Sequence, residues 1–174
     1  MAAGDLGVEL ERVFCRHGRS LFVCALAITR SRELAEDAVQ EAFYRLFRMT
    51  AVPEDVKAYV YRAVRNAAVD QVTRSPVSGE SIEESFFDPG ENPQQAAARG
   101  EFEERVEEVL RRMSPDERET ILQHLYGDLT FREIAELRDV SINTVTSWYR
   151  RGIEKLRTEL EHEYRRIGNE TAQA

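Results

Sequence analysis

The sequence is poor in the residues that crosslink small secreted domains or hold structural metals. Among 174 residues there are two cysteines, Cys15 and Cys24, and three histidines. The cysteines have no C-x-x-C spacing, which argues against both a disulfide framework and a zinc site. We expect both cysteines to be buried, reduced thiols inside a helical core.

Long apolar runs are missing as well. The longest, residues 21–28, is too short to cross a bilayer, and no small-residue cleavage site follows it. A buried helix is the better interpretation, and we expect a cytoplasmic protein. With 42% hydrophobic and 32% charged residues, the composition is typical of a globular chain.

The sequence also lacks the motifs of common enzyme classes. It contains no glycine-rich phosphate loop, no Gly-x-Ser-x-Gly elbow and no His-Glu-x-x-His helix. Glu33, Asp37 and Glu41 share a helix face, but the Glu-x-x-His pairs of di-iron bundles are absent. We therefore expect no catalytic residue, no metal, no cofactor and no enzymatic activity.

A change of composition divides the chain. Residues 76–100 contain three of the five prolines, three glycines, and one basic against five acidic residues. This composition predicts an acidic, flexible linker between two small helical domains, residues 1–75 and 101–174. The fold class expected is all-α, because apolar residues on either side recur at helical steps rather than in strand alternation.

Capping signals place most of the helix starts. Ser31 suits the cap of one helix in the first domain, and Pro53 suits the first turn of the next. In the second domain, Ser114 and Thr130 each precede a glutamate by three residues, as in a capping box, and Ser141 suits the start of a long last helix. The second domain is therefore predicted to have four helices, the last two forming a helix-turn-helix.

The last helix has one apolar and one polar face. The apolar face should pack on the other helices, with Trp148 at its flank and packed on the third helix; its residues are Ile142, Val145, Tyr149, Gly152, Ile153, Leu156 and Leu160. Although the net charge of the chain is −8, residues 141–157 carry four basic residues and one acidic residue. Such a polar face suits a DNA major groove. A capped amphipathic helix with a solvated face is the simpler alternative.

Three stretches resemble a known family. "MSPDERETILQHLYGDLTFREIAELRDVSINTVTSWYRRGIEKLR" resembles region 4 of bacterial sigma factors, above all the extracytoplasmic-function (ECF) class. "AEDAVQEAFYRLFR" is similar to region 2.2, and "VKAYVYRAVRNAAVD" is similar to regions 2.3 and 2.4. The resemblance covers residues 10–160, and its two motif blocks stand in the family's order.

The resemblance implies an alternative sigma factor that binds core RNA polymerase and directs transcription from specific promoters. It implies that the free chain is a monomer, and it leaves open whether an anti-sigma factor binds it. The implied minus-35 DNA contacts are Asn143, Thr144, Thr146, Ser147, Arg150 and Arg151. The implied minus-10 contacts are Lys57, Tyr61, Arg62, Arg65 and Asn66, and the implied polymerase contacts are Glu36, Asp37, Gln40 and Glu41.

Two departures from the family pattern keep other functions open. Many relatives have lysine in place of Thr146 and arginine in place of Trp148, so two positive charges are missing from the implied DNA surface. Each phosphate contact that is lost lowers the affinity for DNA and makes that affinity less dependent on salt concentration. An ordinary helix-turn-helix regulator, or a sigma-like adaptor that binds polymerase without strong promoter readout, are therefore the alternative functions.

Overall fold

The computed structural model describes residues 3–49, 51, 53–74 and 104–171. Every regular element in these ranges is a helix, which confirms the all-α prediction. The expected linker, residues 76–100, lies outside the described residues. None of the described helices is long and apolar enough to span a membrane.

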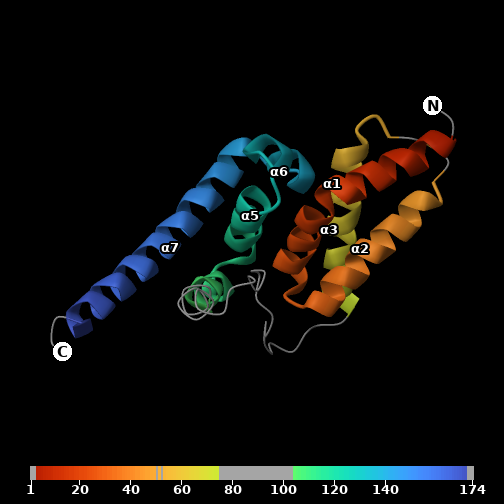
Figure 1. Cartoon of the computed structure of the whole chain (residues 1–174). Coiled ribbons are helices and arrows are strands. Elements are labelled where there is room, and N and C mark those ends of the chain that lie inside the picture. The colour runs from red at the N-terminus through yellow and green to blue at the C-terminus, as the bar shows by residue number, and fades with distance from the viewer. Residues whose placement is uncertain (1–2, 50, 52, 75–103, 172–174) are drawn as a thin grey trace.

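The first three helices form a bundle. They are α1 (Ala3–Thr29), α2 (Arg32–Phe47) and α3 (Val56–Arg74), and each packs against the other two (Figure 1). Small residues of α2, such as Ala35 and Ala38, are fully buried, which lets the helices approach closely. A tyrosine, Tyr61 of α3, is among the largest fully buried side chains.

Local polar groups set the ends of these helices. Arg30 adopts a left-handed conformation (φ 57°) between α1 and α2, and the Ser31 hydroxyl accepts a hydrogen bond from the Leu34 amide at 3.4 Å, as predicted. The start expected at Pro53 is wrong by three residues. Instead the Asp55 carboxylate accepts a bond from the Ala58 amide at 2.9 Å, so α3 begins at Val56.

The second half is a smaller helical domain. Residues 104–112 are helical, followed by α5 (Pro115–Leu125), α6 (Phe131–Arg138) and α7 (Ile142–Thr171). Between α5 and α6, Gly127 lies so close to the preceding turn that a Cβ atom would fall 2.5 Å from the Gln123 carbonyl oxygen. The left-handed residue of that connection is its neighbour, Asp128 (φ 52°).

The helix-turn-helix is built as predicted. The capping box of α6 is complete, because the Thr130 hydroxyl and the Glu133 carboxylate each accept the other residue's amide hydrogen. The helix ends at Asp139 in a left-handed conformation (φ 54°). The Ser141 hydroxyl then accepts a bond from the Thr144 amide at 3.1 Å and starts α7.

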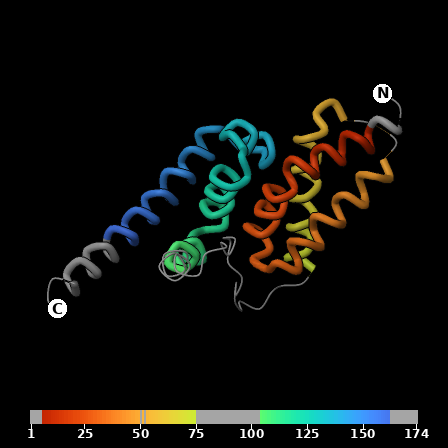
Figure 2. The backbone as a smooth tube through the Cα atoms, in the orientation of Figure 1, coloured from red at the N-terminus to blue at the C-terminus, as the bar shows by residue number. Residues whose placement is uncertain are grey.

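The two halves share one core. Helix α5 packs against α1 on one side and α7 on the other, as the tube in Figure 2 shows. Buried Leu26 and Val60 of the first half belong to the same apolar cluster as Leu122 and Ile134 of the second. The described parts of the two domains are therefore in direct contact.

Two burial predictions are wrong. Cys24 is buried as expected, but Cys15 is exposed because it lies on the outer side of α1. Ile142 was assigned to the apolar face of α7, but it is 47% exposed, since at the first turn of the helix no neighbouring helix covers it.

Candidate nucleic-acid interface

The N-terminal turns of α7 present polar side chains to solvent. Asn143 and Arg150 are exposed, while Val145 between them is fully buried and fixes the rotation of the helix. Neither polar side chain hydrogen-bonds within the part of the chain that the structure describes. An amide and a guanidinium at the start of a helix that follows a tight turn are the groups that read base edges and phosphates in a major groove.

Hydroxyl groups on the same turns bond mainly to the helix itself. The Thr146 and Ser147 hydroxyls donate to the carbonyls of Ile142 and Asn143, four residues back, at 2.6 and 2.7 Å. Thr144 shares a 2.8 Å hydrogen bond with the Ser141 hydroxyl. The Thr146 and Ser147 oxygens can still accept hydrogen bonds, but their own protons are already in use, whereas either hydroxyl of the Ser141–Thr144 pair can be the donor.

The buried carboxylate of Glu117 holds Arg151 and Lys155 of α7 in place. Glu117 of α5 accepts hydrogen bonds from Arg151 at 3.1 Å and from Lys155 at 2.6 Å, and its own side chain is 6% exposed. Burial alone would raise the pKa of Glu117, but the bonds from Lys155 and Arg151 lower it below its ordinary value. Two cations of α7 are thereby fixed in position on the domain surface.

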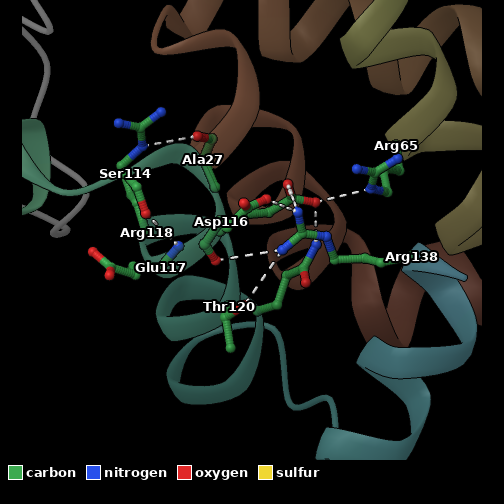
Figure 3. A network of polar contacts seen from close by, with 10 residues as sticks. Ala27, Arg65, Ser114, Asp116, Glu117, Arg118, Thr120 and Arg138 are labelled. Atoms are coloured by element: carbon green, nitrogen blue, oxygen red, sulfur yellow. Dashed lines mark hydrogen bonds and ion pairs between the residues drawn. The ribbon is translucent and has the colours of Figure 1, made fainter. Parts of the chain in front are cut away.

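A buried cation, Arg138, lies against α7. The Arg138 guanidinium stacks on the Trp148 ring, 4.4 Å from its centre, and bonds to Asp116. Trp148 is half-buried, and its ring contacts Arg138 of α6, the third helix of the domain, as predicted. The guanidinium also pairs with Glu119 at 3.6 Å, and Glu119 in turn pairs with Arg65 of α3 (Figure 3).

Four of the five implied minus-10 residues of α3 contact the second domain. Lys57 pairs with Glu133 at 2.7 Å and Arg65 with Glu119 at 2.9 Å. Two further contacts go to main-chain carbonyl oxygens: the Tyr61 hydroxyl donates to Gly127 at 3.2 Å, and Arg62 donates to Glu136 at 3.3 Å. We call these four pairs the interdomain contact.

Burial distinguishes Tyr61 from the fifth minus-10 candidate, Asn66. Tyr61 is 2% exposed, so in this conformation its ring cannot stack on a base. Asn66 is exposed, as is Tyr59, which lies on the same helix. Burial raises the pKa of the Tyr61 phenol, which therefore stays protonated and acts as a donor.

The implied polymerase face of α2 is open. Glu36, Asp37 and Gln40 are exposed, and Glu41 is partly exposed and paired with Arg45 at 2.7 Å. Beside it runs an apolar groove of about 920 Å³ between α1 and α2. Its lining includes Glu36, Gln40, Phe14, Phe22, Val39, Phe43, Tyr44 and Phe47.

Sequence reasoning missed the carboxylates that organise these surfaces. Glu117 and Glu133 were noted only as capping residues, and Glu119 was not noted at all. Their cationic partners lie 19 to 76 residues away in the chain. No local pattern signals such pairs, although a carboxylate among the apolar residues of α5 is an indirect hint.

Comparison with known proteins identifies both halves. Residues 13–75 match the family described as Sigma-70 region 2, and residues 103–156 match Sigma-70, region 4. No curated protein matches the chain at a significant level. The chain belongs to the sigma-70 family: it is a DNA-binding transcription initiation factor that associates with RNA polymerase. The prediction of a sigma factor with regions 2 and 4 is confirmed.

Two solved structures share the fold. The sigma factor RpoE of Bartonella quintana, solved in complex with the anti-sigma factor NepR, superposes with a TM-score of 0.66 at 20% identity, covering 90% of this chain and 97% of that one. The extracytoplasmic function sigma factor SigJ of Mycobacterium tuberculosis gives a TM-score of 0.51 at 21% identity, covering 86% of this chain and 52% of that one.

Proposed function

We propose that this chain is an alternative sigma factor of the ECF class in which α7 reads the minus-35 element, α3 holds the minus-10 strand and α2 docks on core polymerase. One observation carries the proposal: the chain contains both sigma regions, and its helix α7 begins with an exposed polar turn. The chain is proposed to work in the cytoplasm as a monomer and to have no enzymatic activity.

Readout of the minus-35 duplex is assigned mainly to Asn143 and Arg150. Both side chains are exposed and unengaged within the described chain, whereas Thr144, Thr146 and Ser147 already donate or share their protons. A bidentate amide suits adenine, and a guanidinium suits guanine or phosphate. Arg151, which is fixed by Glu117, is assigned to a backbone phosphate. A phosphate contact positions the protein on the duplex and does not require the side chain to reach a base edge.

Capture of the minus-10 strand is assigned to α3. Lys57, Arg62 and Arg65 are donors along one helix, and they suit a phosphate backbone. Asn66 is exposed on the same helix and can hydrogen-bond an unpaired base. Tyr61 can join them only after the interdomain contact has opened, because its ring is buried against the second domain.

Docking on the polymerase is assigned to the acidic face of α2. Exposed Glu36, Asp37 and Gln40 offer negative charge and hydrogen-bond acceptors, with the apolar groove directly beside them. A charged rim steers assembly and fixes register, while an apolar groove supplies affinity. By analogy with RpoE, which was solved with an anti-sigma factor, such a protein is a further proposed partner.

Footprinting tests this division of labour. The chain is mixed with bacterial core RNA polymerase, the complex is isolated by gel filtration, and its protection of genomic promoter fragments is mapped. We expect a stable complex that protects one asymmetric site with minus-35 and minus-10 segments. Asp37→Arg should abolish co-elution, whereas Glu108→Gln, on the second domain, should leave it unchanged. A palindromic footprint by a dimer of the free chain would instead identify an ordinary regulator.

A further inference from the structure

The first turn of α7 carries apolar surface next to its polar side chains. Ile142 is 47% exposed, and among the described side chains of the second half only Leu125, at 48%, is as large, apolar and open. A single exposed apolar side chain is ordinary on a protein surface. Ile142 differs by its position, because it is the first residue of α7 and precedes exposed Asn143 in the turn that is proposed to enter the major groove.

Thr146 extends this apolar surface by one turn. Its hydroxyl donates to the Ile142 carbonyl at 2.6 Å, so its proton is used inside the helix. The exposed Thr146 side chain therefore offers a methyl group and an acceptor oxygen to a partner. Residues four apart in a helix are separated by about 40° around the axis and about 6 Å along it. The two side chains are thus neighbours, and we call Ile142 and Thr146 the apolar edge of α7.

The apolar edge is held in one orientation. Val145 is fully buried on the opposite side of this turn. One turn later, the Tyr149 ring packs against the rings of His124 and Phe131, so α7 is fixed against rotation. Isoleucine branches at Cβ and strongly prefers one χ1 rotamer in a helix, and the hydroxyl bond of Thr146 restricts that side chain too. Covering the edge therefore costs little side-chain entropy.

The major groove offers one apolar group to such an edge, the C5 methyl group of thymine. Asn143, which follows Ile142, suits adenine, the base that pairs with thymine. One A·T pair, or two neighbouring ones, can therefore satisfy both residues. Because base pairs are stacked about 3.4 Å apart, contacts made by Ile142 and Thr146 should fall within about two base-pair steps of each other.

We propose that the apolar edge of α7 reads thymine methyl groups in the minus-35 duplex. The proposal rests on the proposed function for the place of α7 in the groove, and it deepens that function by naming a base preference. It is particular to this chain at Thr146, the position at which many relatives have lysine. Burial of one methyl group changes an affinity about four-fold, which is the expected size of each contact.

The test removes the methyl group from the DNA. A promoter fragment is mapped by run-off transcription with the wild-type chain and core RNA polymerase. Each thymine of its minus-35 element, on both strands, is then replaced in turn by deoxyuridine, which lacks only the methyl group. The affinity of the chain–polymerase complex for each fragment is measured by fluorescence anisotropy. We expect about four-fold weaker binding at one or two positions, lying within about two steps of each other.

Matched variants remove the partner group from the protein. Thr146→Ser deletes the methyl group and keeps the hydroxyl bond to the Ile142 carbonyl, whereas Thr146→Val keeps the methyl group and deletes the hydroxyl. Thr146→Ser and Ile142→Ala should each bind the thymine fragment at least about four-fold more weakly and should each lose the deoxyuridine effect at one position. Thr146→Val should keep that effect. Leu125→Ala is the control, because Leu125 is equally exposed but lies on α5, and it should bind as the wild type does.

The outcomes separate this readout from the proposed function. Loss of the deoxyuridine effect in Ile142→Ala and Thr146→Ser, with wild-type behaviour of Leu125→Ala, would support the readout. Specific binding with equal affinity for every deoxyuridine fragment, or a minus-35 element without an A·T pair, would overturn it and leave α7 in the groove. Impaired Thr146→Val beside unimpaired Thr146→Ser would overturn the methyl contact of Thr146 and assign the readout to its hydroxyl. Equal affinity for the promoter and for unrelated DNA would overturn the proposed function itself.

Discussion

Replacement of Glu117 by glutamine tests whether the charge beneath α7 stabilises the second domain. The wild-type carboxylate is buried, which is unfavourable, but it receives hydrogen bonds from Lys155 at 2.6 Å and from Arg151 at 3.1 Å. The lowered pKa of Glu117 shows that these bonds outweigh burial. Glutamine keeps the size and an acceptor but loses the charge, so the sign of the effect is destabilising.

The size of the effect follows from the kind of bond lost. A hydrogen bond to a charged group contributes roughly 1 kcal/mol more than a neutral one, and two such bonds are at stake. Because the Arg151 and Lys155 side chains are 55% and 49% exposed, solvent reduces that sum. We expect Glu117→Gln to lower the free energy of unfolding by about 1 kcal/mol at pH 7.

The effect should depend on pH in one direction. Since the folded-state pKa of Glu117 is lowered, its stabilising contribution is complete above the unfolded-state pKa, about 4.3, and is lost as pH falls through the lower folded-state value. Urea unfolding followed by the fluorescence of the single tryptophan, Trp148, measures the difference at pH 7 and at successively lower pH. The wild type and Glu117→Gln should converge in acid.

Two results would refute this reasoning. Equal or greater stability of Glu117→Gln at pH 7 would mean that the burial penalty exceeds the two bonds. A deficit that stays constant as pH falls would mean that glutamine disturbs the packing and that charge is not the cause. The control Glu108→Gln, in an exposed pair with Arg112, should change stability by less than about 0.5 kcal/mol.

Three further predictions concern other parts of the fold. Gly127→Ala should lower the free energy of unfolding in urea by about 1 to 3 kcal/mol, because the new Cβ would meet backbone atoms of Gln123 that cannot rotate away; wild-type stability would contradict the close approach. Arg138→Met should cost about 3 kcal/mol and shift the emission of Trp148, since it leaves a buried carboxylate short of a partner; an unchanged emission spectrum would contradict the stacking. If Arg150 contacts a phosphate, Arg150→Ala should weaken binding to every minus-35 duplex sequence and reduce the slope of log affinity against log salt concentration by about one. Loss of discrimination at one base pair would assign Arg150 to a base instead.

Helix ends were predictable where one residue supplies the signal. Ser31, Thr130 and Ser141 each cap a helix as expected, because a hydroxyl three residues before a free amide needs no distant partner. The start predicted at Pro53 was wrong, because a proline is compatible with the first turn of a helix but does not by itself start one. The acceptor that fixes the start of α3 is the Asp55 carboxylate, two residues later.

Periodicity predicted the cores and failed at their edges. Val145 lies on the expected apolar face of α7 and is fully buried, while Ile142, one turn earlier on the same face, is about half exposed. Cys15 is exposed on a helix whose other side is buried. The pattern gives the direction of a side chain, but the length and position of the neighbouring helix decide whether it is covered.

The relation between the two domains could not be predicted from the sequence. Lys57 and Glu133 are 76 residues apart, and Arg65 and Glu119 are 54 apart. Taken locally, Lys57 and Arg65 are equally suited to solvent or to DNA, and the two glutamates are suited to solvent. Only the packing of α5 on α1 brings the two sets together and gives the acidic residues of the second domain a partner on α3.

Run-off transcription tests the assignment of function most directly. Core RNA polymerase is supplied with the wild-type chain, with a chain carrying Asn143→Ala and Arg150→Ala together, or with the control Glu108→Gln. Discrete transcripts with the wild type and the control, and their loss with the double variant while co-elution with core persists, are the predicted result. Co-elution without discrete transcripts from any genomic promoter would contradict promoter readout and identify the chain as a polymerase-binding adaptor.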